Sequence, residues 1–184
     1  MADMIQKWQS GDVGAFEALF RQYENLVFRT AYLMTGRREE ADDVLQEVFV
    51  TVWKYRHTFN PTRGKITTWL HRITVNQCAK RYRKREPALV SLEEKSLDLP
   101  TTKHQEQPEE ALVSKWEYER LLNAMNTLHH KHRSVLVLRY FNDLSYDEIG
   151  QVVGIPLGTV KSRINQALKS LREQLSIQKE EAST

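Results

Sequence analysis

Apolar residues recur at intervals of three and four along this chain, and this spacing constrains the fold more than any other feature. One stripe runs from Val13 to Met34, through Phe16, Leu19, Phe20, Tyr23, Val27 and Ala31. A second, within residues 39–55, repeats every four residues as Val44 and Leu45, Val48 and Phe49, and Val52 and Trp53. Such spacing is typical of helices that bury one face. Because the chain has only 7 Gly and 5 Pro, we predict an all-α protein.

A change in composition divides the chain into two parts. A third helix is expected from about Ile66 or Thr67 to Arg83, after a loop marked by Asn60, Pro61 and Gly64. Residues 86–110 then carry three prolines among polar and charged residues, without a helical stripe. We therefore expect two small helical domains, at 1–86 and 111–178, joined by a flexible linker at 87–110 and followed by a tail at 179–184. As a coil, a linker of this length spans roughly 25–30 Å.

The charge of the chain is small overall but strongly segregated. The net charge is +3, which by itself is a weak argument for a nucleic-acid partner. The segment from His71 to Arg85 holds six Lys and Arg residues and no acidic residue, whereas the segment from Glu86 to Glu119 holds nine acidic residues and three Lys. This segregation indicates separate roles along the chain.

The sequence lacks the usual signs of secretion and of membrane insertion. The only cysteine, Cys78, excludes an internal disulfide and a cysteine-cluster metal site. The first twelve residues, MADMIQKWQSGD, contain no apolar signal region, and no apolar run approaches the ~20 residues needed to cross a bilayer. We expect a soluble, cytoplasmic protein that does not insert into a membrane.

Residues 145–168, SYDEIGQVVGIPLGTVKSRINQAL, have the pattern of a helix-turn-helix. Ser145 and Glu148 fit a capping box, Gly154 suits the end of the first helix, and Pro156 suits the start of the second. Polar side chains near the start of a second helix can meet base edges and phosphates in the major groove. A helical hairpin with a solvated basic face is the alternative, and the residues alone favour DNA reading.

The segment from Leu144 to Leu175 resembles region four of bacterial sigma factors, which reads promoters, especially in the extracytoplasmic-function (ECF) class. The segment EEADDVLQEVFVTVWK at 39–54 resembles the region-two helix that docks on RNA polymerase. The segment ITTWLHRITVNQCAKRYRKR at 66–85 resembles the adjoining helix that opens and reads the minus ten element. The matches stand in the family's order and extend over nearly the whole chain.

This resemblance implies a sigma factor that binds core RNA polymerase and directs initiation at specific promoters. The implied partners are the β′ clamp helices and β flap of the polymerase, promoter DNA, and an anti-sigma factor. No cofactor is implied.

The resemblance also assigns roles to individual residues. It implies polymerase binding by Asp42, Asp43, Gln46 and Glu47. It implies contact with the minus ten element by Phe59, Arg63, Lys65, Asn76, Lys80 and Arg83. It implies contact with the minus thirty-five element by Thr159, Lys161, Ser162, Arg163, Asn165 and Gln166. Three positions depart from the family pattern, because Ile66 stands where Phe is common, Lys80 where Asp is usual and Gln166 where Arg is frequent.

Other interpretations of these residues remain open. The acidic group at 42–47 could simply be a solvated helix start, and Trp69 fits a core position better than a stacking platform. His129, His130 and His132 suggest a metal, but no other ligand type clusters nearby, so we expect no metal site. A stand-alone helix-turn-helix regulator is the second hypothesis, and it leaves the N-terminal domain unexplained. An enzyme is disfavoured because no catalytic motif is present.

Overall fold

The computed structural model describes the backbone of residues 2–85 and 108–181, and within these ranges every regular element is a helix. The all-α prediction is therefore confirmed. The N-terminal group comprises α1 (Ala2–Gln9), α2 (Val13–Thr35), α3 (Arg38–Lys54), the short 3₁₀ helix η1 (Arg56–Thr58) and α4 (Ile66–Arg85). The C-terminal group comprises α5 (Pro108–Thr127), α6 (His130–Leu136), the π-helix η2 (Val137–Phe141), α7 (Tyr146–Val153) and α8 (Leu157–Glu181).

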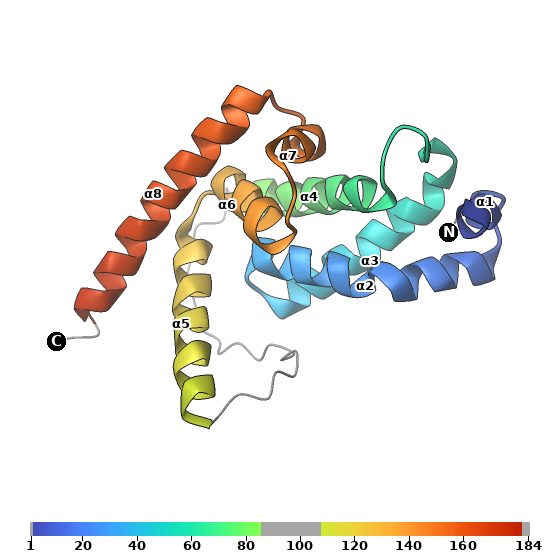
Figure 1. The fold of residues 1–184 in the computed structure, drawn as a ribbon. Helices are drawn as coiled ribbons and strands as arrows, with labels where there is room; N and C mark the ends of the chain where they lie inside the picture. Colours follow the sequence, from blue (N-terminus) through green and yellow to red (C-terminus); the bar gives the residue numbers. More distant parts are fainter. Residues whose placement is uncertain (1, 86–107, 182–184) are drawn as a thin grey trace.

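Local signals in the sequence set the ends of the long helices. Asp12 caps α2, and its carboxylate accepts a hydrogen bond of 2.7 Å from the Ala15 amide. Gly36 ends α2 with φ 76°, and its N–H donates to the Tyr32 carbonyl at 2.8 Å. The left-handed conformation at that position favours glycine. α3 can therefore begin two residues later and return along α2, as Figure 1 shows.

The N-terminal group packs around the apolar stripes of α2 and α3. Leu19, Val27, Val44, Val48 and Val52 are all almost completely buried there. Helix α4 packs against both. Helix α1 was not predicted from the sequence, yet it completes this core because Ile5 and Trp8 are buried against it.

The two helical groups are in direct contact with each other. In Figure 1, α6 and α7 lie beside α4, while α5 and α8 run side by side on the far side of α6. Val75 of α4 packs among buried residues of the C-terminal group, including Leu138 and Ile149. In return, Met125 and Val137 of the C-terminal group pack in the N-terminal core. The apolar contact is therefore shared by both groups.

Polar contacts cross the same boundary. The Asn142 amide donates to the Thr30 hydroxyl at 3.0 Å. The Lys65 ammonium lies 3.3 Å from the Glu148 carboxylate at the start of α7. The expected linker at 87–110 falls mostly outside the described residues, and its last three positions belong to the start of α5. The domain boundaries stay a prediction.

Candidate functional site

The start of α8 carries an exposed polar face that the preceding turn positions. The Ser145 hydroxyl accepts from the Glu148 amide at 3.2 Å, and the Glu148 carboxylate accepts from the Ser145 amide at 2.9 Å, which completes the predicted capping box of α7. Gly150 leaves room for the chain to turn, since a Cβ there would lie 2.9 Å from the Ile155 carbonyl oxygen. Helix α7 and the turn therefore fix where α8 begins.

The six residues predicted for the minus thirty-five element lie together on α8. Val160 and Ile164 are buried against the rest of the domain. The exposed residues are Lys161, Ser162, Asn165 and Gln166, and Thr159 and Arg163 are partly exposed. The Ser162 hydroxyl donates to the Thr159 carbonyl at 3.1 Å in this state. The helix therefore presents hydroxyl, amide and cationic groups on one side, as groove reading requires.

A second polar surface is formed by the loop after η1 and by one face of α4. Asn60 organises the loop, because its side-chain oxygen accepts from the Thr62 amide at 2.9 Å and from the Thr62 hydroxyl at 2.8 Å. Gln9 of α1 holds the start of the loop by donating to the Phe59 carbonyl at 2.6 Å. The exposed residues among those predicted for the minus ten element are Arg63, Lys65, Asn76, Lys80 and Arg83.

Phe59 differs from the other residues predicted for the minus ten element, because its side chain is only 5% exposed. Its ring packs against Trp69, with centroids 5.5 Å apart, and against Trp8, with centroids 6.2 Å apart. In this structure the ring anchors the loop to the core, and Trp69 packs in the same aromatic cluster. The contact between Phe59 and the minus ten element stays a prediction.

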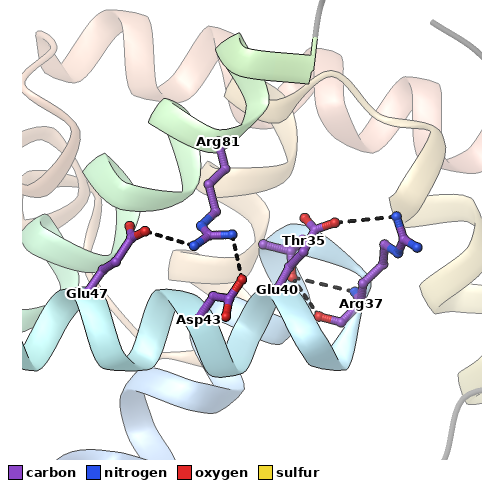
Figure 2. A network of polar contacts seen from close by, with 6 residues as sticks. All are labelled: Thr35, Arg37, Glu40, Asp43, Glu47 and Arg81. Carbon is purple, nitrogen blue, oxygen red and sulfur yellow. Dashed lines mark hydrogen bonds and ion pairs between the residues drawn. The ribbon is translucent and has the colours of Figure 1, made fainter. Parts of the chain in front are cut away.

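The polar face of α3 carries the residues predicted to bind polymerase. Asp43, Gln46 and Glu47 are exposed, and Asp42 is partly exposed. Figure 2 shows that the Arg81 guanidinium of α4 lies between two of them, 3.0 Å from Asp43 and 2.8 Å from Glu47. Desolvation acts against the charge of Arg81, but hydrogen bonds and attraction to Glu47 and Asp43 outweigh it, so the pKa of Arg81 is raised. The face is therefore not a simple solvated acidic surface.

Comparison with known families and proteins agrees with this arrangement. The family models described as Sigma-70 region 2 and Sigma-70 region 4 match residues 19–87 and 124–173. The chain is 33% identical over 177 residues to the ECF RNA polymerase sigma factor SigW of Bacillus subtilis, covering 93% of this chain and 94% of SigW. This chain belongs to the ECF family of RNA polymerase sigma factors.

Further relatives support the same assignment. The ECF RNA polymerase sigma factor RpoE of Cereibacter sphaeroides is 32% identical over 168 residues, covering 90% of this chain and 88% of RpoE. The fold is similar to that of the sigma factor RpoE of Bartonella quintana, solved with the anti-sigma factor NepR, with a TM-score of 0.68 at 20% identity over 88% of this chain and 97% of that chain. The protein is a sigma factor that directs RNA polymerase to promoters. A stand-alone regulator would leave the region-two match unexplained.

Two arginines of the sigma factor make contacts that were missed in the sequence. Arg81 was grouped with the basic run of α4, although its side chain faces α3. The sequence did hold a signal, because Thr74, Gln77 and Arg81 follow Leu70 at helical spacing. Arg133 was assigned no role, yet it is buried between the two groups and bonds to the Leu33 carbonyl at 2.6 Å. No periodicity in the sequence indicates that partner, because it is a backbone atom 100 residues away.

Within the described part of the sigma factor, no group of three or more potential ligand side chains could hold a metal ion. The rings of His129 and His130 instead pack against Tyr82, at centroid distances of 5.5 and 4.3 Å. In the same ranges of residues, no helix combines the length and the apolar character needed to cross a membrane.

Proposed function

We propose that this sigma factor reads promoters with two separate arms. The exposed start of α8 would contact the minus thirty-five element as duplex DNA, through Lys161, Ser162, Asn165 and Gln166. The loop after η1 and the outer face of α4 would open and read the minus ten element, through Arg63, Lys65, Asn76, Lys80 and Arg83. The polar face of α3 would dock on the β′ clamp helices, and region four would meet the β flap.

The observation that carries this proposal is that α4 has two distinct faces, one packed on α3 and the other exposed. One face packs on α3, where the Gln77 amide donates to the Thr51 hydroxyl at 3.1 Å. The opposite face leaves Asn76, Lys80 and Arg83 exposed. Amide and cationic groups along one exposed face fit a track for a single strand, which needs backbone contacts and access to bases. The docking face and the DNA face can therefore be occupied at the same time.

The two arms are too close in this structure to occupy both promoter elements together. The elements are centred about 25 base pairs apart, which is roughly 85 Å of duplex at 3.4 Å per base pair. The Lys65 ammonium in one arm lies 3.3 Å from Glu148 of the helix-turn-helix. We therefore expect the two domains to separate when the sigma factor binds polymerase and promoter.

We further propose that an anti-sigma factor controls this sigma factor. We also propose that the sigma factor acts in the cytoplasm and does not itself catalyse a reaction. The support is the fold shared with the Bartonella quintana sigma factor, which was solved with the anti-sigma factor NepR. The compact contact between the two domains is a form that such a partner could hold closed.

The test of the proposed function is run-off transcription with core polymerase and a promoter library. We expect starts at one class of promoter that depend on the protein. The pair Lys161→Ala and Gln166→Ala should weaken upstream recognition and leave core binding intact, and the pair Asp43→Ala and Gln46→Ala should weaken core binding. The same defect in both pairs would argue against this division of roles.

A further inference from the structure

Arg81 bridges two acidic residues of α3 in an arrangement that the promoter-reading role of its helix does not explain. One terminal nitrogen lies 3.0 Å from an Asp43 oxygen, and the other lies 2.8 Å from a Glu47 oxygen (Figure 2). The Arg81 side chain is 26% exposed, whereas Asp43 and Glu47 are 58% and 47% exposed. The arginine is thus the covered member of the group, and the carboxylates are its outer members.

The neighbours of Arg81 in the basic run point elsewhere. Lys80, Arg83 and Lys84 are all exposed. Arg81 instead follows Gln77 by one helical turn on the face that packs against α3, where Gln77 bonds to Thr51. On α3, Asp43, Glu47 and Thr51 form a matching row at intervals of four residues. The run CAKRYRKR therefore contains two populations of cations that face different partners.

The chemistry of this bridge suits positioning. Asp43 and Glu47 are four residues apart on one helix, where like charges repel each other. A planar guanidinium can donate to both at once, because its N–H groups have a fixed fork geometry. Each carboxylate uses one oxygen toward Arg81, and both acidic side chains remain about half exposed, so an external donor can approach them. Holding the two side chains in one geometry also removes part of the entropy cost of binding.

We propose that Arg81 is a positioning residue for polymerase docking: it holds Asp43 and Glu47 so that their outer oxygens face the basic groups of the polymerase clamp. This inference rests on the proposed docking role of those two carboxylates. It also removes Arg81 from the set of cations available to the minus ten element. The alternative is that Arg81 occupies the two carboxylates and competes with the polymerase for them. Loss of Arg81 would then strengthen core binding, whereas the positioning role predicts that its loss weakens core binding.

The test is the affinity of the full-length protein for core polymerase, measured for wild type, Arg81→Ala, Arg81→Lys and Arg83→Ala. We expect Arg81→Ala to weaken core binding about tenfold, the size of effect expected when binding must itself order two side chains that Arg81 no longer holds. Arg81→Lys should recover only part of the affinity, because an ammonium does not reproduce the fork. Arg83→Ala, two residues away, should leave core binding unchanged and lower promoter opening at saturating core. Unchanged or tighter core binding by Arg81→Ala would overturn the inference.

A double-mutant cycle separates positioning from an independent contact. If Arg81 acts through Asp43 and Glu47, Arg81→Ala should add little to the loss in core binding already caused by Asp43→Ala and Glu47→Ala together. Fully additive losses would overturn the inference. Gln77→Ala controls for loosening of the same helix contact, since it breaks the bond to Thr51 and should leave core affinity at the wild-type value. Core affinity lowered equally by Gln77→Ala would mean that Arg81 has only a structural role.

The core affinities of two variants distinguish a failure of the proposed docking face from a failure of the inference about Arg81. If the double variant Asp43→Ala and Gln46→Ala binds core polymerase as tightly as wild type does, the polar face of α3 is not the docking face. If that pair weakens core binding while Arg81→Ala does not, only the role of Arg81 is wrong.

Discussion

The Arg133 side chain of α6 donates through Nε to the Leu33 carbonyl of α2 at 2.6 Å, and so caps a helix of the other domain. Leu33 lies in the last turn of α2, where carbonyls lack partners within the helix and where a cation interacts favourably with the helix dipole. The Arg133 guanidinium also donates to the Asn126 side chain. Burial lowers the pKa of Arg133 to about 10. The contact thus combines good hydrogen bonds with a costly buried charge.

This balance predicts that Arg133→Lys is more harmful than Arg133→Met. Lysine still buries a charge but cannot form both bonds of the guanidinium, so we expect a loss of about 2 kcal/mol in the free energy of unfolding. Methionine leaves the Leu33 carbonyl without this donor but removes the desolvation of the charge, and the two effects should nearly cancel. Urea denaturation of wild type, Arg133→Lys and Arg133→Met gives the order of their free energies of unfolding. A larger loss for methionine would mean that the hydrogen bonds outweigh the desolvation.

Gly36 should tolerate alanine less well than Gly154 does, although both have positive φ values, 76° and 73°. A Cβ at Gly36 would lie 2.2 Å from the Asn126 side-chain oxygen, whereas a Cβ at Gly154 would meet no atom within 4 Å. Gly154→Ala should therefore cost only the backbone strain, about 1 kcal/mol. Gly36→Ala should cost more, because it also displaces the side chain that accepts from Arg133. Thermal unfolding of both variants gives the comparison.

A cycle with Asn126→Ala tests the cause of this difference. If the clash with Asn126 is responsible, Gly36→Ala should cost no more than Gly154→Ala once Asn126 is alanine. An unchanged cost would place the strain in the backbone alone.

His71 should make the folded state sensitive to mild acid. It is 3% exposed on α4, and burial lowers its pKa to about 4, against the opposing effect of the Glu148 carboxylate. A lowered folded pKa means that the unfolded chain binds the proton first as pH falls. Stability is therefore complete above about pH 6.5 and falls progressively toward pH 4, by about 2 kcal/mol at pH 5.

The measurement is the free energy of unfolding between pH 7.5 and pH 4.5 for wild type and His71→Gln. The variant should show a flatter dependence in this range. His57→Gln is the matched control, because His57 is exposed, and its dependence should follow that of wild type. Parallel curves for all three proteins would show that His71 does not control the acid response.

Sequence patterns predicted the elements well where one helix buries one stripe. The bounds of α2, α3 and α7 follow from apolar spacing and from capping residues such as Asp12 and Ser145, which act locally. Helix α1 was missed because it is short and its two buried residues, Ile5 and Trp8, do not make a recognisable stripe. Its packing partners lie far along the chain, so tertiary contacts, and not local sequence signals, stabilise this helix.

The candidate site could be predicted where the spacing of apolar residues shows which side chains are exposed. The exposed polar face at the start of α8 follows from the spacing of Val160 and Ile164. The basic run of α4 could not be divided so easily, since Arg81 and Arg83 have the same chemistry and only packing on α3 separates them. Phe59 was placed near DNA by resemblance, and the aromatic cluster with Trp8 became evident only from the fold. The contact between the two domains had no sequence signal.

Cross-linking the two domains should block transcription reversibly. Cysteines in place of Lys65 and Glu148 would flank the contact that spans 3.3 Å between the native side chains. A short thiol cross-linker cleavable by reductant should join them. Native Cys78 should not interfere, because it is buried and burial raises the pKa of its thiol to about 12. We expect the joined protein to lose run-off transcription from a promoter with both elements. On reduction it should regain the activity of the untreated double-cysteine variant, which lacks the Lys65 contact.

Each single-cysteine variant treated with the same reagent controls for loss of the Lys65 side chain and of the capping-box carboxylate. The exposed ion pair itself contributes little, under about 1 kcal/mol, so these variants should stay folded. If the joined protein starts transcription as efficiently as the reduced one, the two domains need not separate at Lys65 and Glu148. The expected result instead follows from geometry, since elements about 25 base pairs apart cannot both be reached while these positions are held together.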